Sequence, residues 1–220
     1  MASLGKAPFV TQVVEVNYET IANLTEADGW NDLDNVEILE MGLGWDKSTG
    51  GHGGILGWAS RKVGSDLDGL AVFRVNKQPI KYLGWDELDC FETEAPGAAV
   101  HTGDNQTGEG SGDDETIRLN LRAIPRRFDE ILLITTAFKP GSDMRRAKNI
   151  TTTLYDSTGG RKTPVAFIEP SLLKPKNTIG VAMLRRKGDS WELKVVNKSI
   201  DVKQGDRDDF LIRTATLMAD

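Results

Sequence analysis

The amino-acid sequence predicts an all-β protein, a two-sheet β-sandwich with a few short helical turns. Long segments with helical periodicity are absent, short runs of alternating apolar and polar residues are common, and turn sequences separate these runs. In the first run, Val13 to Tyr18, the apolar residues Val14, Val16 and Tyr18 alternate with polar ones. A period of two is typical of a strand with one buried face.

The later elements follow the same logic. Residues 116–121 and 191–196 also alternate, whereas Ile131–Phe138 is continuously apolar and predicts a strand buried on both faces. Glycine-containing turns at 156–160 and 187–190 predict two hairpins, over 151–168 and 182–196. Short helical turns are expected near 123–130 and 169–175. We expect one domain over residues 1–200, followed by a strand or a partner-binding tail over 201–220.

Composition limits the function classes. The chain has 220 residues, a net charge of −6 and one cysteine, Cys90, so an internal disulfide or a multi-cysteine zinc site is excluded. The first residues lack the long apolar core of a secretory leader, and no apolar run is long enough to span a membrane, so we expect no export signal and a cytoplasmic protein. Because the acidic balance and isolated basic pairs do not favour nucleic acid, no nucleic-acid partner is expected.

The segment HTGDNQTGEGSGDDE, residues 101–115, is the most unusual in the chain. It contains no Lys or Arg, and it carries five carboxylates and four glycines: Asp104, Glu109, Asp113, Asp114 and Glu115, with Gly103, Gly108, Gly110 and Gly112. Glycine lets the backbone fold back so that the oxygens converge. Convergent carboxylates suit Ca²⁺, which takes about six to eight oxygen ligands, better than Mg²⁺ or zinc. The alternative is a solvated acidic loop.

The loop is not an EF-hand. Asp104 and Glu115 have the spacing of the first and last ligands, but Glu109 stands where that motif needs glycine, and a strand pattern follows. A second acidic pair, Asp66 and Asp68, precedes an apolar strand and, being two residues apart, shares one face. The pair is either a set of additional ligands or a polar strand entry.

The same segment closely resembles the signature of the TerD family of tellurite-resistance and stress-response calcium-binding proteins. Three weaker matches follow in the family's order: GLGWD at 42–46, DLDGLAVF at 66–73 and RRKGDSWELKVV at 185–196. Together they span roughly residues 10 to 200. The chain is identified as a divergent member because Ser111 stands where the family has Asp, the connection over residues 47–65 is longer than usual, and a second LGWDE at 83–87 replaces an expected strand.

The resemblance implies a bacterial or phage β-sandwich that binds two Ca²⁺ ions at one end. It implies side-chain ligands from two segments and carbonyl ligands from two glycines: Asp66, Asp68, Asp104, Asn105, Glu109, Asp113, Asp114 and Glu115, with Gly103 and Gly108. Because Ser111 removes one carboxylate, the number of sites, one or two, stays open.

The favoured function is a non-catalytic sensor or scaffold whose acidic loops order on Ca²⁺ binding and present a surface to a protein partner. Ile55, Leu56 and Trp58 are a candidate apolar contact surface, with a buried strand as the alternative. A Ca²⁺-dependent membrane-docking module, peripheral to the membrane, is the second hypothesis; it would use Arg61 and Lys62.

A metal-dependent hydrolase is the least favoured hypothesis. The only two imidazoles, His52 and His101, lie in no recognisable nucleophile arrangement, and Ser111 is not flanked by the glycines of a nucleophile elbow. We expect His101 to order the entrance of the acidic loop by hydrogen bonding. Cys90 is expected to be a small core residue, since one thiol does not support tellurite reduction.

Overall fold

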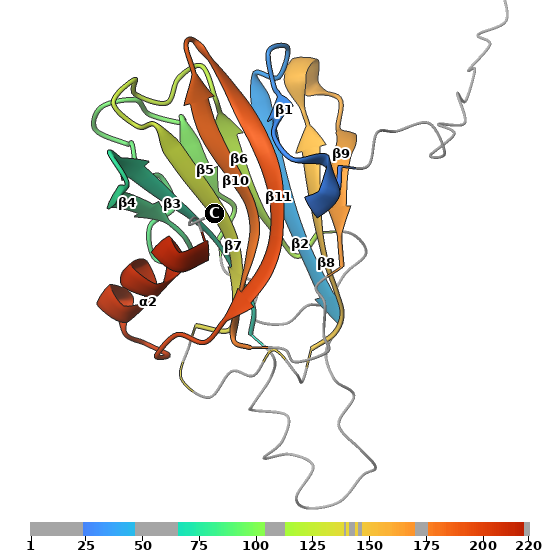
Figure 1. Ribbon diagram of the computed structural model, residues 1–220, viewed down its shortest axis with the longest axis vertical. Coiled ribbons are helices and arrows are strands. Elements are labelled where there is room, and N and C mark those ends of the chain that lie inside the picture. The colour runs from blue at the N-terminus through green and yellow to red at the C-terminus, as the bar shows by residue number, and fades with distance from the viewer. Residues whose placement is uncertain are drawn as a thin grey trace, which may run out of the picture.

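Two antiparallel sheets pack face to face in the computed structural model (Figure 1), which describes residues 24–46, 66–103, 113–138, 140, 144, 147–169 and 176–217. The larger sheet, sheet A, has the order β1 (Asn31–Asp32), β11 (Ser190–Ile200), β10 (Thr178–Lys187), β7 (Glu130–Thr136), β3 (Asp68–Val75) and β4 (Gln78–Leu83). Sheet B has the order β5 (Ala99–His101), β6 (Glu115–Asn120), β2 (Ile38–Asp46), β8 (Lys148–Asp156) and β9 (Thr163–Ile168). The predicted β-sandwich is confirmed.

The remaining elements are short. They are the 3₁₀ turns η2 (Glu26–Asp28), η4 (Thr158–Gly160) and η5 (Ala215–Leu217), and the helix α2 (Arg207–Thr214). Among the described residues, no helix is long and apolar enough to cross a membrane. Residues 123–129 form turns in place of the helical turn expected over 123–130, and Glu130 already begins β7. The predicted strand at 13–18 and residues 170–175 of the second expected helical turn lie outside the described residues.

The strand predictions hold where they can be compared. Both predicted hairpins are present, as β8 with β9 and β10 with β11. The apolar run that begins at Ile131 forms β7, which lies between β10 and β3 in sheet A. Ile131 and Leu133 pack into the core between the sheets, while Leu132 and Ile134 pack against the cluster under α2. A strand buried on both faces needs no polar alternation, which explains its sequence.

Aromatic side chains fill the middle of the core. Phe91 packs edge-on against Phe73 and Phe128, with ring centroids 4.9 and 5.2 Å apart. Trp191 is buried, and its indole N–H donates to the carbonyl of Leu121 at 3.1 Å, so the polar atom of this ring is satisfied.

Cys90 belongs to the same core, as predicted. It is 6% exposed, and burial raises the pKa of its thiol to about 12. The reactive thiolate is therefore scarce at neutral pH.

The segment over residues 201–220 was expected to be a strand or a tail, whereas the structure has the helix α2 there. The domain boundary at residue 200 stays a prediction. Helix α2 lies against the outer face of sheet A (Figure 1), where Phe210 packs on Leu70 and Val72. The side chain of Asp206 caps the helix by accepting from the N–H of Asp209 at 3.0 Å. With eight residues and a largely polar sequence, the helix has too little periodicity to be recognised.

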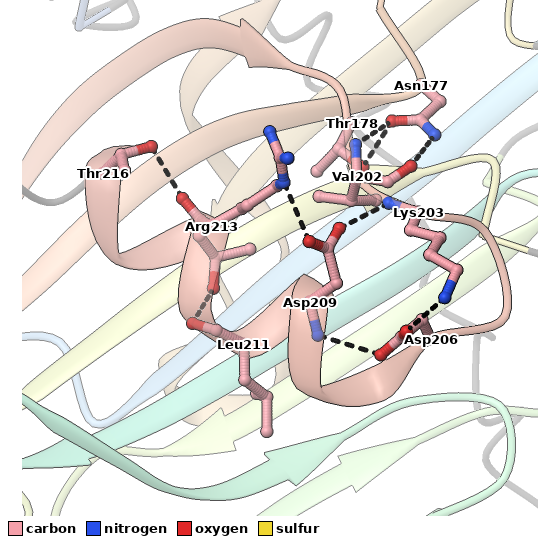
Figure 2. Close-up of polar contacts among 10 residues, drawn as sticks. Asn177, Thr178, Val202, Lys203, Asp206, Asp209, Leu211, Arg213 and Thr216 are labelled. Carbon is pink, nitrogen blue, oxygen red and sulfur yellow. Dashed lines mark hydrogen bonds and ion pairs between the residues drawn. The ribbon is translucent and has the colours of Figure 1, made fainter.

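Asn177 fastens this segment to the sheet (Figure 2). Its amide donates to the carbonyl of Val202 at 2.6 Å, and its oxygen accepts from the N–H of Val202 at 2.8 Å. A two-way bond of this kind fixes the chain where it leaves β11 and turns toward α2. The C-terminal segment therefore packs on the outer face of sheet A.

Replacing Phe210 by alanine tests this packing. Phe210 is 2% exposed and its ring stacks edge-on against Phe138, with centroids 5.4 Å apart. Phe210→Ala is expected to lower the free energy of unfolding by about 3 kcal/mol, measured by urea denaturation. Ile212→Ala is the control, because Ile212 is 70% exposed on the same helix. Equal effects of the two substitutions would contradict the packing of α2.

Candidate metal site

Two acidic segments that are distant in sequence meet at one end of the sandwich. Asp68 opens β3 in sheet A, and Glu115 opens β6 in sheet B. The N–H of Gly69, next to Asp68, donates to Oε2 of Glu115 at 2.9 Å. This end therefore holds both groups of acids that the sequence singled out.

Glu115 lies inside the sandwich, beside His101. Their side chains are 1% and 0% exposed, and Nε2 of His101 is 3.4 Å from Oε2 of Glu115. Nδ1 of His101 accepts from the N–H of Gly103 at 2.9 Å, and this bond turns the other ring nitrogen, Nε2, toward Glu115. The prediction that His101 orders the entrance of the acidic loop is confirmed by this bond.

Two threonines extend this arrangement into a polar layer, defined here as Glu115, His101, Thr135 and Thr152. Thr135 and Thr152 are fully buried, and their hydroxyls lie 3.3 Å apart across the two sheets. The layer separates the main core from a smaller apolar cluster that includes Leu43 and Trp45. The bond between the two threonines and the bond from Gly69 to Glu115 both join sheet A to sheet B, and buried bonds of this kind help to fix how the sheets pack at this end.

Asp68 occupies a different face of β3. By strand alternation it shares a face with Leu70, which packs in the cluster under α2, whereas Gly69 faces Glu115. Asp68 is fully buried and pairs with Thr136, whose hydroxyl is 2.7 Å from that of Thr178. Asp66, the other acid of the pair, is partly buried just before the strand.

Asp114 continues the pairing of β6 with β2 beyond the last ladder residue. Its N–H donates to the carbonyl of Leu43 at 2.7 Å, and its carboxylate accepts from the N–H of Trp45 at 3.0 Å. A carboxylate thus takes the place of a backbone carbonyl at the end of the ladder. The arrangement holds the acidic segment against the GLGWD motif, an association that sequence reasoning missed.

Asp113 lies on the outer face of sheet B, directly over Gly42. A Cβ at position 42 would overlap the Asp113 carboxylate, so any other residue there would displace this carboxylate. The carboxylate is 3.8 Å from the ammonium of Lys162, which also contacts Glu40 at 2.8 Å. Burial raises the pKa of the Asp113 carboxyl, and the attraction of Lys162 opposes that shift.

The donors at this end are of the kind that a hard cation needs, since they are carboxylate oxygens. Within the described part of the chain, no group of three or more His, Cys, Asp or Glu side chains is placed to hold a metal. Gly103 is described, with φ of +106°. The other predicted ligands and the candidate apolar surface lie outside the described residues: Asp104, Asn105, Gly108 and Glu109, together with Ile55, Leu56 and Trp58. The ligand set therefore stays a prediction.

Comparisons with known proteins identify the family. A model of the TerD domain matches residues 31–204. The tellurium resistance protein TerZ of Serratia marcescens is 31% identical over 157 residues, which cover 70% of this chain and 76% of that protein. General stress protein 16U of Bacillus subtilis is 35% identical over 103 residues, which cover 44% of this chain and 45% of that protein.

A solved structure supports the fold. A homologue of telluride resistance protein (TerD) from Streptomyces coelicolor A3(2) superposes with a TM-score of 0.63, covering 82% of this chain and 98% of its own. Its sequence is 14% identical, so the likeness concerns the fold alone.

Truncating Glu115 tests the polar layer. Glu115→Ala removes the acceptor of the Gly69 N–H and the neighbour of His101, leaving two donors buried in the sandwich. The free energy of unfolding is expected to fall by roughly 2–4 kcal/mol, measured by urea denaturation in EDTA. Thr116→Ala, on the opposite face of the same strand, is expected to change it by less than about 0.5 kcal/mol. A Glu115→Ala protein as stable as the Thr116→Ala protein would refute the role of the layer.

Proposed function

The chain belongs to the TerD domain family, and from this we propose that it is a non-catalytic Ca²⁺-binding module of the tellurite-resistance and stress-response type. The observation that carries the proposal is the meeting of two acidic segments, at the start of β3 and the start of β6, through the bond between Gly69 and Glu115. Acids concentrated at one end of a fold repel one another unless a cation neutralises them.

The proposed ligands come from both segments. Asp66 and Asp68 would supply oxygens from the strand entry in sheet A. The acidic loop would supply the rest, from Asp104, Asn105, Glu109, Asp113, Asp114 and Glu115 and the carbonyls of Gly103 and Gly108. Each Ca²⁺ ion takes about six to eight oxygen ligands. To serve two ions, some carboxylates of this set must bridge the ions or bind through both oxygens, and water would complete the shells.

Ca²⁺ binding would give the module its sensor or scaffold role. The ends of the acidic loop are held to the sandwich, by His101 on one side and by the contacts of Asp114 and Glu115 on the other. Ion binding would then order the segment between two fixed points and change the surface offered to a protein partner. We propose that the protein acts in the cytoplasm.

The same contacts argue against catalysis at this end. Both ring nitrogens of His101 face protein groups and its side chain is fully buried, so this imidazole is not placed to take a proton from a substrate. The named relatives are called resistance or stress proteins.

Calorimetric titration of the EDTA-stripped protein with Ca²⁺, in the presence of Mg²⁺ as competitor, tests the proposal. We expect binding in the micromolar range or tighter with a stoichiometry near two. A ligand that binds only the folded state at about 100 times its Kd stabilises it by about 2.7 kcal/mol, so the melting temperature should rise. Absence of heat and of a thermal shift would refute a Ca²⁺ module.

Carboxylate-to-amide substitutions test the ligand set. Asp104→Asn and Asp114→Asn are each expected to weaken Ca²⁺ binding by about tenfold or more, because a charged ligand is lost. In the Asp114→Asn protein the side-chain amide oxygen can still accept from the Trp45 N–H, so the fold should persist. Asp34→Asn is the control, an exposed acid in the turn after β1. Unchanged affinity in both ligand variants would show that the assignment is wrong.

Removing the Lys162 ammonium should have the opposite effect. Lys162 attracts the Asp113 carboxylate at 3.8 Å and therefore competes with a bound cation. Lys162→Met is expected to tighten Ca²⁺ binding by about two- to fivefold, read from the same titration. Lys198→Met, on β11 in sheet A, is the control that removes one positive charge elsewhere. Equal tightening in both variants would show an effect of net charge, and weaker binding in Lys162→Met would contradict competition for Asp113.

A further inference from the structure

We propose that the opposite end of the sandwich carries a second site, a pocket that binds small organic phosphates. The pocket has a volume of about 530 Å³ and lies between the β10–β11 hairpin, the turn after β1 and the turns after β6. Ladder register puts Ser190 and Lys187 at this end, and Asp68, Thr136 and Thr178 at the acidic end. Figure 1 shows the strands of β10 and β11 running the length of the sandwich between these ends.

Basic side chains outnumber acidic ones in the lining of the pocket. The protein as a whole has a net charge of −6. The charged residues that line the pocket are four bases and two acids: Arg122, Arg126, Arg186 and Lys187, with Asp34 and Asp189. Three of these bases are ion-paired, Arg122 with Glu37, Arg126 with Asp189, and Lys187 with Asp32 and Glu192. Among the described residues this leaves Arg186 without a carboxylate partner, and an anionic ligand would supply one.

Arg186 is the central group. Its guanidinium donates to the carbonyl of Phe128 at 2.9 Å and to that of Ile124 at 3.2 Å, and among the described residues it forms no ion pair with a carboxylate. Burial, more than the neighbouring charge of Arg126, lowers the pKa of Arg186, and the carboxylates of Asp189 and Asp129 oppose that shift. A bound anion would stabilise this partly buried charge, which carbonyl dipoles neutralise only in part.

The guanidinium of Arg186 is also held rigidly. It stacks on the ring of Trp191, 4.2 Å from the centroid, and the indole is itself fixed by its bond to Leu121. A preorganised arginine loses little side-chain entropy when it binds an oxyanion. A purely structural arginine that clamps the 124–128 turn would use the same carbonyl bonds, so the two roles must be separated by ligand binding.

Arg126 and Lys187 lie at the rim of the pocket, and a ligand could replace the present partner of Arg126. Arg126 pairs with Asp189 at 2.6 Å, but both side chains are 80% exposed. Exposed pairs of this kind are worth about 0–1 kcal/mol, so a ligand can displace Asp189 from Arg126 at small cost. Lys187 is paired with Asp32 and Glu192, and it contributes charge at the rim.

Size and charge identify the ligand class. A phosphate monoester carries a charge of about −1.5 to −2 at neutral pH, which the guanidinium groups of Arg186 and Arg126 would offset. Arginine forks bind phosphate oxygens in pairs. Leu33, Val36 and Leu121 give the pocket an apolar part, which would face the organic group of the ester. The volume is within the range of small-molecule sites, about 300–1,000 Å³.

Calorimetry with phenyl phosphate, inorganic phosphate and phenol tests the site. The titrations are made in EDTA without Ca²⁺, so the result does not depend on the proposed function of the acidic end. We expect phenyl phosphate to bind more tightly than inorganic phosphate by about threefold or more because of the apolar lining, and phenol not to bind. No binding of either phosphate at about 10 mM, a concentration that detects even millimolar affinity, or binding of phenol equal to that of phenyl phosphate, would overturn the proposal.

Two substitutions with opposite expected effects locate the binding. Arg126→Ala is expected to weaken phenyl phosphate binding by about tenfold. Asp189→Asn is expected to tighten it by a few-fold, because it frees Arg126. Arg161→Ala, an exposed arginine outside the pocket lining, is the matched control and should leave the affinity unchanged. Equal loss in the Arg126→Ala and Arg161→Ala proteins would place the phosphate elsewhere and overturn the site.

Discussion

The buried carboxylate of Glu115 is the constraint on which the acidic end of the sandwich depends. A charged or hydrogen-bonding group inside a protein is stable only when its partners are fixed. Here the N–H of Gly69 from sheet A and the imidazole of His101 from sheet B meet one carboxylate. The two sheets are therefore joined at the point where the acidic loop begins and ends.

The three successive acids of the GDDE sequence make contacts in three different directions. Asp113 turns outward over Gly42 toward Lys162, Asp114 extends the ladder to Trp45, and Glu115 turns inward. In a regular strand Asp113 and Glu115, two residues apart, would share a face; they face opposite ways because β6 begins only at Glu115 and Asp113 precedes it. A metal site that uses all three carboxylates must therefore take ligands from both faces of the chain where it enters β6. The GLGWD segment is the surface against which these three acids are held.

The local sequence pattern was sufficient to predict the strands but not the side-chain contacts between elements. Turn residues predicted both hairpins and a continuous apolar run predicted the buried strand β7, because these features depend on neighbours in sequence. The contact of Asp113 with Lys162 and the hydrogen bonds of Arg186 to the 124–128 turn join residues far apart in the chain. Helix α2 was missed because its stability comes from Phe210 packing on sheet A and from capping, which leave little periodic signal.

A crystal structure of the Ca²⁺-loaded chain, with ions located by anomalous scattering, tests the central claim most directly. The account predicts two ions between the start of β3 and residues 103–115, coordinated by carboxylate and carbonyl oxygens at about 2.3–2.6 Å. Ions bound elsewhere, or an acidic end that holds none at saturating Ca²⁺, would contradict it.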